Sequence, residues 1–251
     1  MGIQYLFLLI LPQNNIMSGK IYLIPITLGE TSPYKVLPAD ILPLAQSIKY
    51  FIVENTRTAR RFLKTLDKDI VIDELTFFEI NKRTRHSELV KFLQHAINGN
   101  DIGIMSEAGC PGVADPGADA VKVAHEKGID VVPLVGPSSI LLSLMASGMN
   151  GQSFTFVGYI PIKQPSRSKT IRYMEQQAIK HDQTQIFIET PYRNNAIVEE
   201  MLNSLTNNTR LCIACDITLE SEYIKTKTVK EWKSTTLPDL HKRPAIFLIG
   251  R

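Results

Sequence analysis

The stretch SEAGCPGVADPG, residues 106–117, joins an apolar run to a segment with helical spacing. The apolar run DIGIM, residues 101–105, is typical of a buried strand, and ADAVKVAHEKG, residues 118–128, is typical of a helix that ends at a glycine. Glycines and prolines in the loop between them allow positive φ angles and fix the chain direction. Such a loop at the carboxyl end of a parallel strand is where open α/β sheets bind ligands. The pattern predicts a ligand-binding loop, and a tight connection without a ligand stays equally open.

The composition is ordinary for a globular chain, with 44% hydrophobic and 21% charged residues. A length of 251 residues suits one large domain or two smaller ones with a sizeable core. The formal net charge of +3 permits an anionic partner such as RNA without requiring one. Three cysteines are too few for a disulfide framework, so we expect a reducing, cytoplasmic compartment.

The first residues form a segment of their own. The run YLFLLIL, residues 5–11, is far too short to cross a bilayer, which takes about 20 residues, and no lysine or arginine precedes it. Met17 then opens MSGKIYLIP, which is typical of the start of a soluble protein. We therefore expect no association with a membrane. We also expect an N-terminal extension over residues 1–18, in which residues 1–16 precede Met17. An extra edge strand or a disordered tail is the alternative.

Strand and helix patterns alternate along the first half of the chain. Strands are predicted over residues 20–26, 50–54, 69–78, 101–105 and 130–134. Helices are predicted over residues 39–48, 55–66, 87–97 and 118–127. Asn55 or Thr56 is available as the N-cap of the second helix. The repeated order of strand and helix predicts a parallel sheet with helices on both faces.

A second unit is predicted to begin near residue 135. Strands are expected over residues 153–158, 183–189, 210–218, 222–229 and 245–250. Helices are expected over residues 140–148, 172–180 and 194–205, with a polar basic loop over residues 159–169. We therefore predict an α/β fold of two α/β domains, residues 19–134 and 135–251, the second of which mixes parallel units with antiparallel strands.

Several common chemistries lack their motifs in this sequence. It contains no GxGxxG after a strand, no GxxxxGK[ST] and no GxSxG. Cys212 and Cys215 lie in a predicted strand, where an odd spacing places their side chains on opposite faces. The five histidines are scattered without metal-ligand spacing, so we expect no metal site.

Six blocks of sequence, in order, resemble the tetrapyrrole methylase superfamily of S-adenosylmethionine-dependent methyltransferases. They are IYLIPITLGE, ENTRTARRFL, SEAGCPGVADPG, VGPSS, GYIPIK and ETPYR. The last five resemble the EDTR, SDAGTPGISDPG, PGPSA, GFLPRK and ESPHR blocks of the small-subunit ribosomal RNA methyltransferase I group, which methylates a cytidine ribose 2′-hydroxyl. The resemblance covers residues 20–249. It implies two α/β domains of tetrapyrrole methylase type with the cofactor cleft between them, and a homodimer.

The resemblance also implies where S-adenosylmethionine binds. Loop 108–115 and the VGPSS segment line the cofactor pocket in such proteins, and glycines let the backbone approach a ligand. Serines at a helix N-terminus favour a carboxylate, although plain N-capping is the alternative. The residues that we expect to contact the cofactor are Pro25, Ala108, Gly109, Pro111, Gly112, Asp115, Val135, Ser138, Ser139 and Gly158.

A hydroxyl nucleophile needs a group that accepts its proton or balances its charge. The candidate catalytic residues are Glu54 and Glu189, each at the end of a predicted strand, and Arg57 in the ENTR block. An ion pair between Arg57 and Glu54 at the first turn of the helix is the alternative.

Basic side chains can hold RNA phosphates, and the candidates are Lys163, Arg167 and Arg193. Basic runs are more often solvated surface, so this alternative stays open. Tyr159 and Tyr192 can stack on a base, and a core role is equally open.

Two residues depart from the group's pattern. Thr27 replaces an early glycine of the first loop, and Asn55 replaces the aspartate of EDTR. If that aspartate acts as a base, Asn55 cannot. Three functions therefore remain: RNA ribose 2′-O-methylation by a ribosomal-type enzyme, methylation of a tetrapyrrole-like or other small molecule, and cofactor binding without catalysis.

Overall fold

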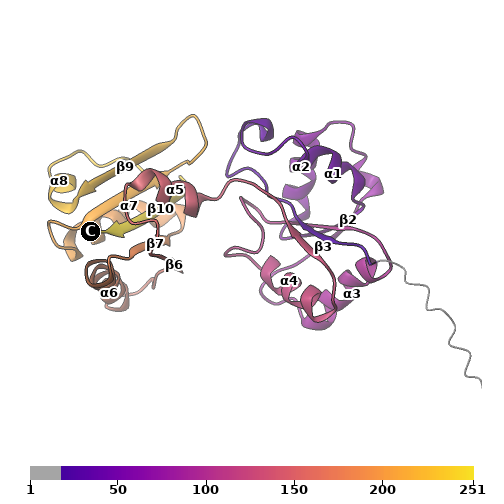
Figure 1. Cartoon of the computed structure of the whole chain (residues 1–251). Helices are drawn as coiled ribbons and strands as arrows, with labels where there is room; N and C mark the ends of the chain where they lie inside the picture. The colour runs from indigo at the N-terminus through magenta and orange to yellow at the C-terminus, as the bar shows by residue number, and fades with distance from the viewer. Residues whose placement is uncertain (1–17) are drawn as a thin grey trace, which may run out of the picture.

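The computed structural model describes residues 18–251 and contains two five-stranded sheets (Figure 1). The first sheet has the order β3-β2-β4-β1-β5, and its strands all run parallel. Its strands are β1 (Ile21–Leu23), β2 (Tyr50–Val53), β3 (Thr76–Glu79), β4 (Ile102–Met105) and β5 (Val131–Pro133). The prediction for residues 1–16 lies outside the described residues. No helix of residues 18–251 is long and apolar enough to span a membrane.

Helices cover both faces of the first sheet, as the alternating pattern predicts. They are α1 (Ile41–Ser47), α2 (Thr56–Leu66), α3 (His86–Ile97) and α4 (Gly117–Glu126). Successive strand residues point to opposite faces, so Phe51 packs into the cluster under α1 and α2 while Ile52 packs into the cluster under α3 and α4. Figure 1 shows these helix pairs above and below the sheet.

The second sheet has the order β6-β7-β10-β8-β9. Its strands are β6 (Phe154–Tyr159), β7 (Thr184–Ile188), β8 (Arg210–Cys215), β9 (Tyr223–Thr228) and β10 (Ala245–Gly250). Only the β6–β7 pair is parallel, which confirms the predicted mixture. Cys212 and Cys215 belong to different apolar clusters, as their spacing predicts.

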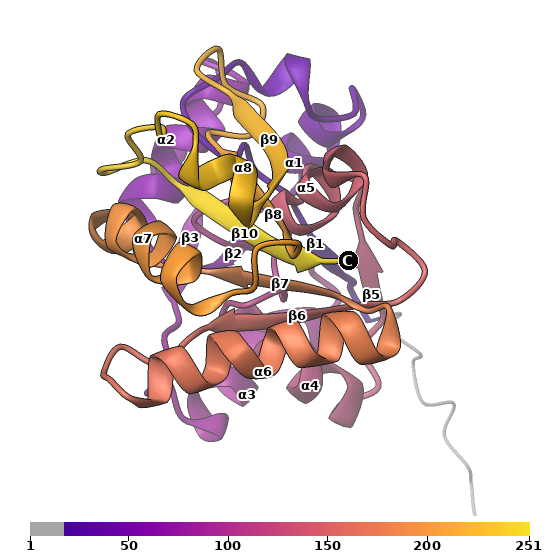
Figure 2. The same cartoon turned by 90° about the vertical axis from the view of Figure 1, so that its left-hand side faces the viewer.

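The helices of the second half are α5 (Ser139–Ser147), α6 (Ser166–His181), α7 (Asn194–Ser204) and α8 (Val229–Lys233). In Figure 2, α6 and α7 lie on the outer side of this half, whereas α5 lies beside the first half in Figure 1. The outer cluster includes the fully buried Trp232, whose Nε1 donates a hydrogen bond to the carbonyl of Leu211 at 2.8 Å.

Two predicted elements were wrong in extent, and one helix was not predicted. Helix α6 begins at Ser166 rather than at 172, because Ile171, Met174 and Ala178 form a buried stripe that the full helix supports. The strand predicted over 69–78 shrinks to β3, and a 3-10 turn, Ile72–Glu74, precedes it. Helix α8 was missed, since its five residues rest on a capping box between Thr228 and Glu231.

The two halves meet through short connections. Leu134 still donates its N–H to the carbonyl of Leu23 at 3.2 Å, and Ser138 caps α5 four residues later. Leu28 of the first half packs against the inner apolar cluster of the second sheet. The loops at the carboxyl ends of β1, β2 and β4 therefore face the second sheet. The division at residues 134 and 135 stays a prediction.

Candidate functional site

The loop between β4 and α4 is held in shape by its own polar groups. The carboxylate of Asp115 accepts hydrogen bonds from the backbone N–H of Gly112 at 2.9 Å and of Gly117 at 2.6 Å. Gly109 and Gly112 have φ angles of 70° and 84°, which favour glycine. Ile26 donates its N–H to the carbonyl of Gly109 at 3.0 Å, so the loop is also tied to the segment after β1.

A second loop, residues 134–138, packs closely against the first. A Cβ atom on Gly109 would lie 3.1 Å from the carbonyl oxygen of Pro137, and one on Gly136 would lie 2.2 Å from Cβ of Pro25. The hydroxyl of Ser138 accepts a hydrogen bond of 3.5 Å from the N–H of Leu141 and caps α5. The two glycines therefore allow an approach of backbones that any larger residue would prevent.

Two adjoining cavities lie between the two halves, and together we call them the intersheet cleft. Their volumes are about 250 and 300 Å³. Both are lined by Leu28, Ala108, Ser139, Tyr159 and Ile188. The first cavity also includes Glu54, Gly109, Asp115 and Ser138, and the second includes Glu189, Ala214, Asp216 and Ala245.

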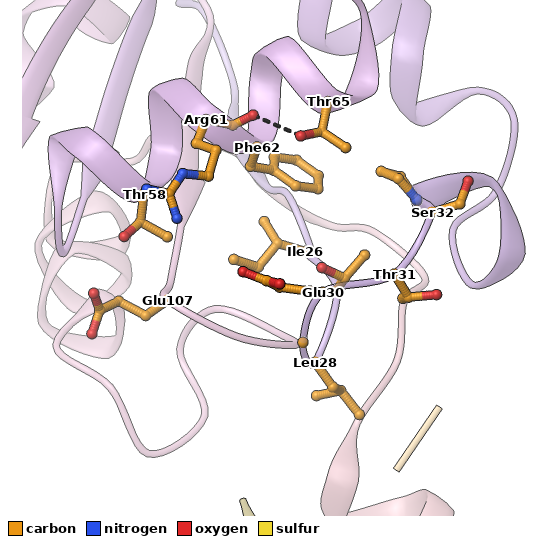
Figure 3. A pocket seen from close by; sticks show the side chains of 13 residues that line it. Ile26, Leu28, Glu30, Thr31, Ser32, Thr58, Arg61, Phe62, Thr65 and Glu107 are labelled. Atoms are coloured by element: carbon orange, nitrogen blue, oxygen red, sulfur yellow. Dashed lines mark hydrogen bonds between the residues drawn. The ribbon is translucent and has the colours of Figure 1, made fainter. Parts of the chain in front are cut away.

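A third cavity, which we call the first-loop pocket, lies between the segment after β1 and helix α2 (Figure 3). It has a volume of about 570 Å³ and is lined by residues 26–33, Thr58, Arg61, Phe62, Thr65 and Glu107. Leu28 borders both this pocket and the intersheet cleft, so the two spaces adjoin at the first loop.

Glu54 lies at the end of β2, on the wall of the intersheet cleft. Its Oε1 accepts a hydrogen bond of 3.1 Å from the N–H of Glu107. Partial burial raises the pKa of the Glu54 carboxyl; the backbone hydrogen bond opposes this, and the nearby carboxylates of Asp115 and Glu107 add to it. No ion pair joins Glu54 to Arg57 within the described residues, so the alternative of a first-turn ion pair is not formed.

Glu189 lies at the end of β7 and is buried. Its Oε1 accepts a hydrogen bond of 2.7 Å from the N–H of Thr190 and pairs with the guanidinium of Arg193. The hydrogen bond that the Arg193 guanidinium donates to the Glu189 carboxylate raises the pKa of Arg193. The other oxygen, Oε2, is buried without a hydrogen-bond partner in the described part of the chain. Glu189 therefore already balances one cation, and its carboxylate has no exposed surface in the cleft.

The structure brings half of the predicted cofactor residues to the cleft. Ala108, Gly109, Asp115, Ser138 and Ser139 line it. The other predicted cofactor residues are not among the described residues lining either cavity; they are Pro25, Pro111, Gly112, Val135 and Gly158.

The predicted phosphate-binding residues are dispersed. Lys163 is exposed in the loop before α6. Arg167 forms an ion pair of 2.5 Å with Glu200, and Arg193 pairs with Glu189. Two of the three cations are therefore already balanced by carboxylates.

Sequence reasoning missed the far wall of the cleft. Asp216, Pro244 and Ala245 carry no recognisable motif, and only the pairing of β8 with β10 brings them together. Tyr159 was proposed for base stacking, and its position on the cleft is compatible with that role. Arg61 and Phe62 also escaped notice, although they stand in the ENTRTARRFL block.

The cleft fits S-adenosylmethionine by its own chemistry. Ser138 and Ser139 stand at the N-terminus of α5, where backbone N–H groups favour a carboxylate. Leu28 and Ile188 supply apolar walls for a flat ring. These groups line the two adjoining cavities of the cleft, and their chemistry suits the carboxylate and the ring of the cofactor.

Solved structures share this architecture at low sequence identity. The methyltransferase CobJ superposes with a TM-score of 0.62 at 15% identity and covers 93% of this chain and 95% of its own. The cobalt precorrin-4 methyltransferase CbiF gives 0.57 at 14%, covering 96% and 98%. Uroporphyrin-III C-methyltransferase from Thermus thermophilus, complexed with S-adenosyl homocysteine, gives 0.52 at 16%, covering 93% and 98%. The fold is therefore that of the tetrapyrrole methylases. Relatives by sequence, taken together with this fold, identify the protein as an S-adenosylmethionine-dependent methyltransferase.

Relatives by sequence carry a narrower name, ribosomal RNA small subunit methyltransferase I. The one from Halalkalibacterium halodurans is 30% identical over 213 residues, which are 85% of this chain and 69% of the relative. The one from Vibrio cholerae is 28% identical over 205 residues, covering 82% and 67%. The one from Streptococcus pyogenes is 31% identical over 185 residues, covering 74% and 60%. No family model matches the chain. The chain belongs to the ribosomal RNA small subunit methyltransferase I family.

Proposed function

We propose that this protein transfers the methyl group of S-adenosylmethionine to a ribose 2′-hydroxyl of small-subunit ribosomal RNA. The name of the relatives supports the RNA acceptor. The observation that carries the proposal is the position of Glu54 on the cleft, where it faces no counter-cation in the described residues and its carboxyl has a raised pKa. A hydroxyl acceptor requires such a group, because its proton must leave as the new bond forms.

When bound, S-adenosylmethionine supplies an activated methyl group, whose carbon–sulfur bond breaks as the new carbon–oxygen bond forms. Glu54 accepts the hydroxyl proton, and its raised pKa makes it a stronger base than an exposed carboxylate. The rigid loop around Asp115 and the N-terminus of α5 hold the cofactor in one orientation. Alignment of this kind contributes several kcal/mol, up to about 7–11 kcal/mol in ideal cases.

The remaining site residues receive roles by position. Ala108, Gly109, Ser138 and Ser139 contact the cofactor. The other predicted cofactor residues shape the loops that carry these contacts.

Three further assignments belong to the proposal. The exposed side chains of Arg57 and Lys163 attract the RNA backbone. The protein acts in the cytoplasm, in keeping with its three free cysteines. It works as a homodimer, as its family resemblance implies.

The test is transfer of a labelled methyl group from S-adenosylmethionine to purified small ribosomal subunits and to deproteinised small-subunit RNA. Glu54→Gln should abolish most transfer while calorimetry shows unchanged cofactor binding. Gly109→Val should abolish cofactor binding, because its φ of 70° and the Pro137 carbonyl at 3.1 Å leave no room for a branched side chain. Cofactor binding without transfer to either RNA sample, or transfer to an added porphyrinoid instead, would contradict the proposal.

A further inference from the structure

We infer that the first-loop pocket holds the nucleotide that is methylated, with Arg61 at its phosphate and Glu30 at an exocyclic amino group of its base. The inference rests on the proposed RNA acceptor and adds to it the place, the contacts and the base preference. Its basis is the position of the pocket, the make-up of its floor and the state of its charged side chains.

The position of the pocket follows from one hydrogen bond and one shared residue. Glu107 lines the pocket and donates its N–H to Oε1 of Glu54 at 3.1 Å, so the proposed base stands where the pocket meets the cleft. Leu28 forms part of the wall on both sides. Because a 2′-hydroxyl and its base belong to one nucleotide, a hydroxyl at Glu54 leaves the base only a few ångströms away. The first-loop pocket is the larger of the spaces within that reach.

The floor of the pocket suits a flat ring. Ile26 and Phe62 are both buried residues that line it, and Figure 3 shows Phe62 and Ile26 side by side at the centre of the view. Bases stack on aromatic and apolar side chains without regard to sequence. A volume of about 570 Å³ falls within the range of small-molecule sites, about 300–1,000 Å³. The pocket is therefore large enough for a nucleotide.

Two charged side chains at the rim of the pocket have no partner among the described residues. Arg61 and Glu30 are exposed, and Figure 3 shows Arg61 extending from its helix and Glu30 below Ile26 in the view. Neither side chain forms a hydrogen bond or ion pair with the described residues. By contrast, Arg167 and Arg193 are each paired with a carboxylate. An unpaired guanidinium at the edge of an apolar pocket is suited to a phosphate.

Glu30 gives the pocket a preference among bases. A carboxylate accepts a hydrogen bond from an exocyclic amine, such as N4 of cytosine or N6 of adenine, and repels the carbonyl that uracil presents instead. The N-terminus of α2 does not provide a competing anion site. Its first N–H groups are already bonded to the side chains of Glu79 and Asn55. Arg61 is therefore the principal phosphate contact of the pocket.

The first experiment measures RNA affinity by filter binding with S-adenosylhomocysteine present, so that no turnover occurs. Arg61→Ala should weaken binding of small-subunit RNA by roughly tenfold or more, as expected for a lost charge-assisted hydrogen bond. Arg60→Ala is the matched control, since Arg60 precedes it on α2, is exposed, and packs over Phe77 rather than lining the pocket. It removes the same charge and should change affinity by less than about threefold. Equal losses in both variants would overturn the inference, because they would reflect general electrostatic attraction.

The second experiment tests the base preference with nucleoside 5′-monophosphates as competitors of RNA binding. Cytidine and adenosine monophosphates should compete better than uridine monophosphate by roughly tenfold, the value of one good hydrogen bond to a charged group. Glu30→Gln should remove this difference, whereas Glu199→Gln, an exposed carboxylate on α7, should keep it. No competition by any monophosphate, or a preference that survives Glu30→Gln, would overturn the inference. Failure of the proposed function would give a different result from failure of this inference. In that case the wild-type protein would bind RNA and would not methylate it.

Discussion

Glu54 and Glu189 occupy equivalent places in two different sheets, each directly after a strand and each on the wall of the intersheet cleft. Glu189 is buried and paired with Arg193, four residues further along the chain. Glu54 is only partly buried, accepts one backbone hydrogen bond and has no cationic partner among residues 18–251. The same side chain at the same strand position therefore meets two different electrostatic environments.

The contrast shows how position in the fold gives two carboxylates different electrostatic surroundings. The guanidinium of Arg193 pairs with the carboxylate of Glu189 and anchors the turn between β7 and α7. Desolvation and neighbouring carboxylates destabilise the charged form of Glu54, so this residue gains from accepting a proton. Sequence motifs alone rank the two residues equally, and their surroundings distinguish them.

The largest effect is expected from Glu54→Gln. Glutamine keeps the shape and can still accept the N–H of Glu107, yet it cannot take a proton. Loss of a general base typically lowers the rate by about 10²–10⁴-fold. Single-turnover methyl transfer to small-subunit RNA measures this loss, and cofactor calorimetry checks that the cleft is intact. A rate within tenfold of wild type would remove Glu54 from the chemistry.

Glu189→Gln should have its main effect on the free energy of unfolding and a smaller effect on the rate of methyl transfer. The change leaves the partly buried guanidinium of Arg193 without its anionic partner. We expect the free energy of unfolding to fall by about 1–3 kcal/mol, with a smaller loss in transfer rate than for Glu54→Gln. Urea unfolding followed by far-ultraviolet circular dichroism measures the first quantity. If the rate fell further than in Glu54→Gln while stability held, the two carboxylates would have exchanged roles.

Glu107→Gln should change the pH dependence slightly. Protonated Glu54 cannot accept a proton, so the transfer rate falls as pH decreases through its raised pKa. Glu107 is the smallest of the causes that raise this pKa, and its removal should move the acid limb to lower pH. Asp119→Asn, on the exposed surface of α4, is the matched control and should leave the limb in place. A shift toward higher pH would show that another group titrates.

Asn55→Asp should have almost no effect. Asn55 departs from the aspartate of the family block, but its Oδ1 caps α2 by accepting the N–H of Arg57 at 2.9 Å and of Thr58 at 3.2 Å. Aspartate caps a helix about as well, whereas Asn55→Ala should cost about 0.5–2 kcal/mol of stability. Thermal unfolding and the transfer rate measure both variants. A tenfold faster Asn55→Asp enzyme would mean that position 55 contributes to proton transfer.

Much of the fold could be predicted because it depends on local patterns. The parallel order of the first half follows from alternating strands and helices, and the cap at Asn55 follows from residue type. The predicted boundaries of helices were wrong where tertiary contacts outweighed the polar character of the local sequence. The start of α6 reads as a polar loop, yet Ile171 and Met174 give the helix a core face to which its first turn is attached.

The sequence by itself determined the class of this protein, its family and the central loop of residues 106–117, because glycines, prolines and an internal carboxylate fix a loop through local bonds. Only the tertiary structure decided which charged residues are available for chemistry. Glu54, Glu189 and Arg61 are all charged residues in the blocks that carry the family resemblance, and the sequence does not distinguish their environments. Their burial and partners depend on where β2, β7 and α2 place them, at the intersheet cleft for the two glutamates and at the first-loop pocket for Arg61. Electrostatic energies depend on distances in space rather than on spacing along the chain.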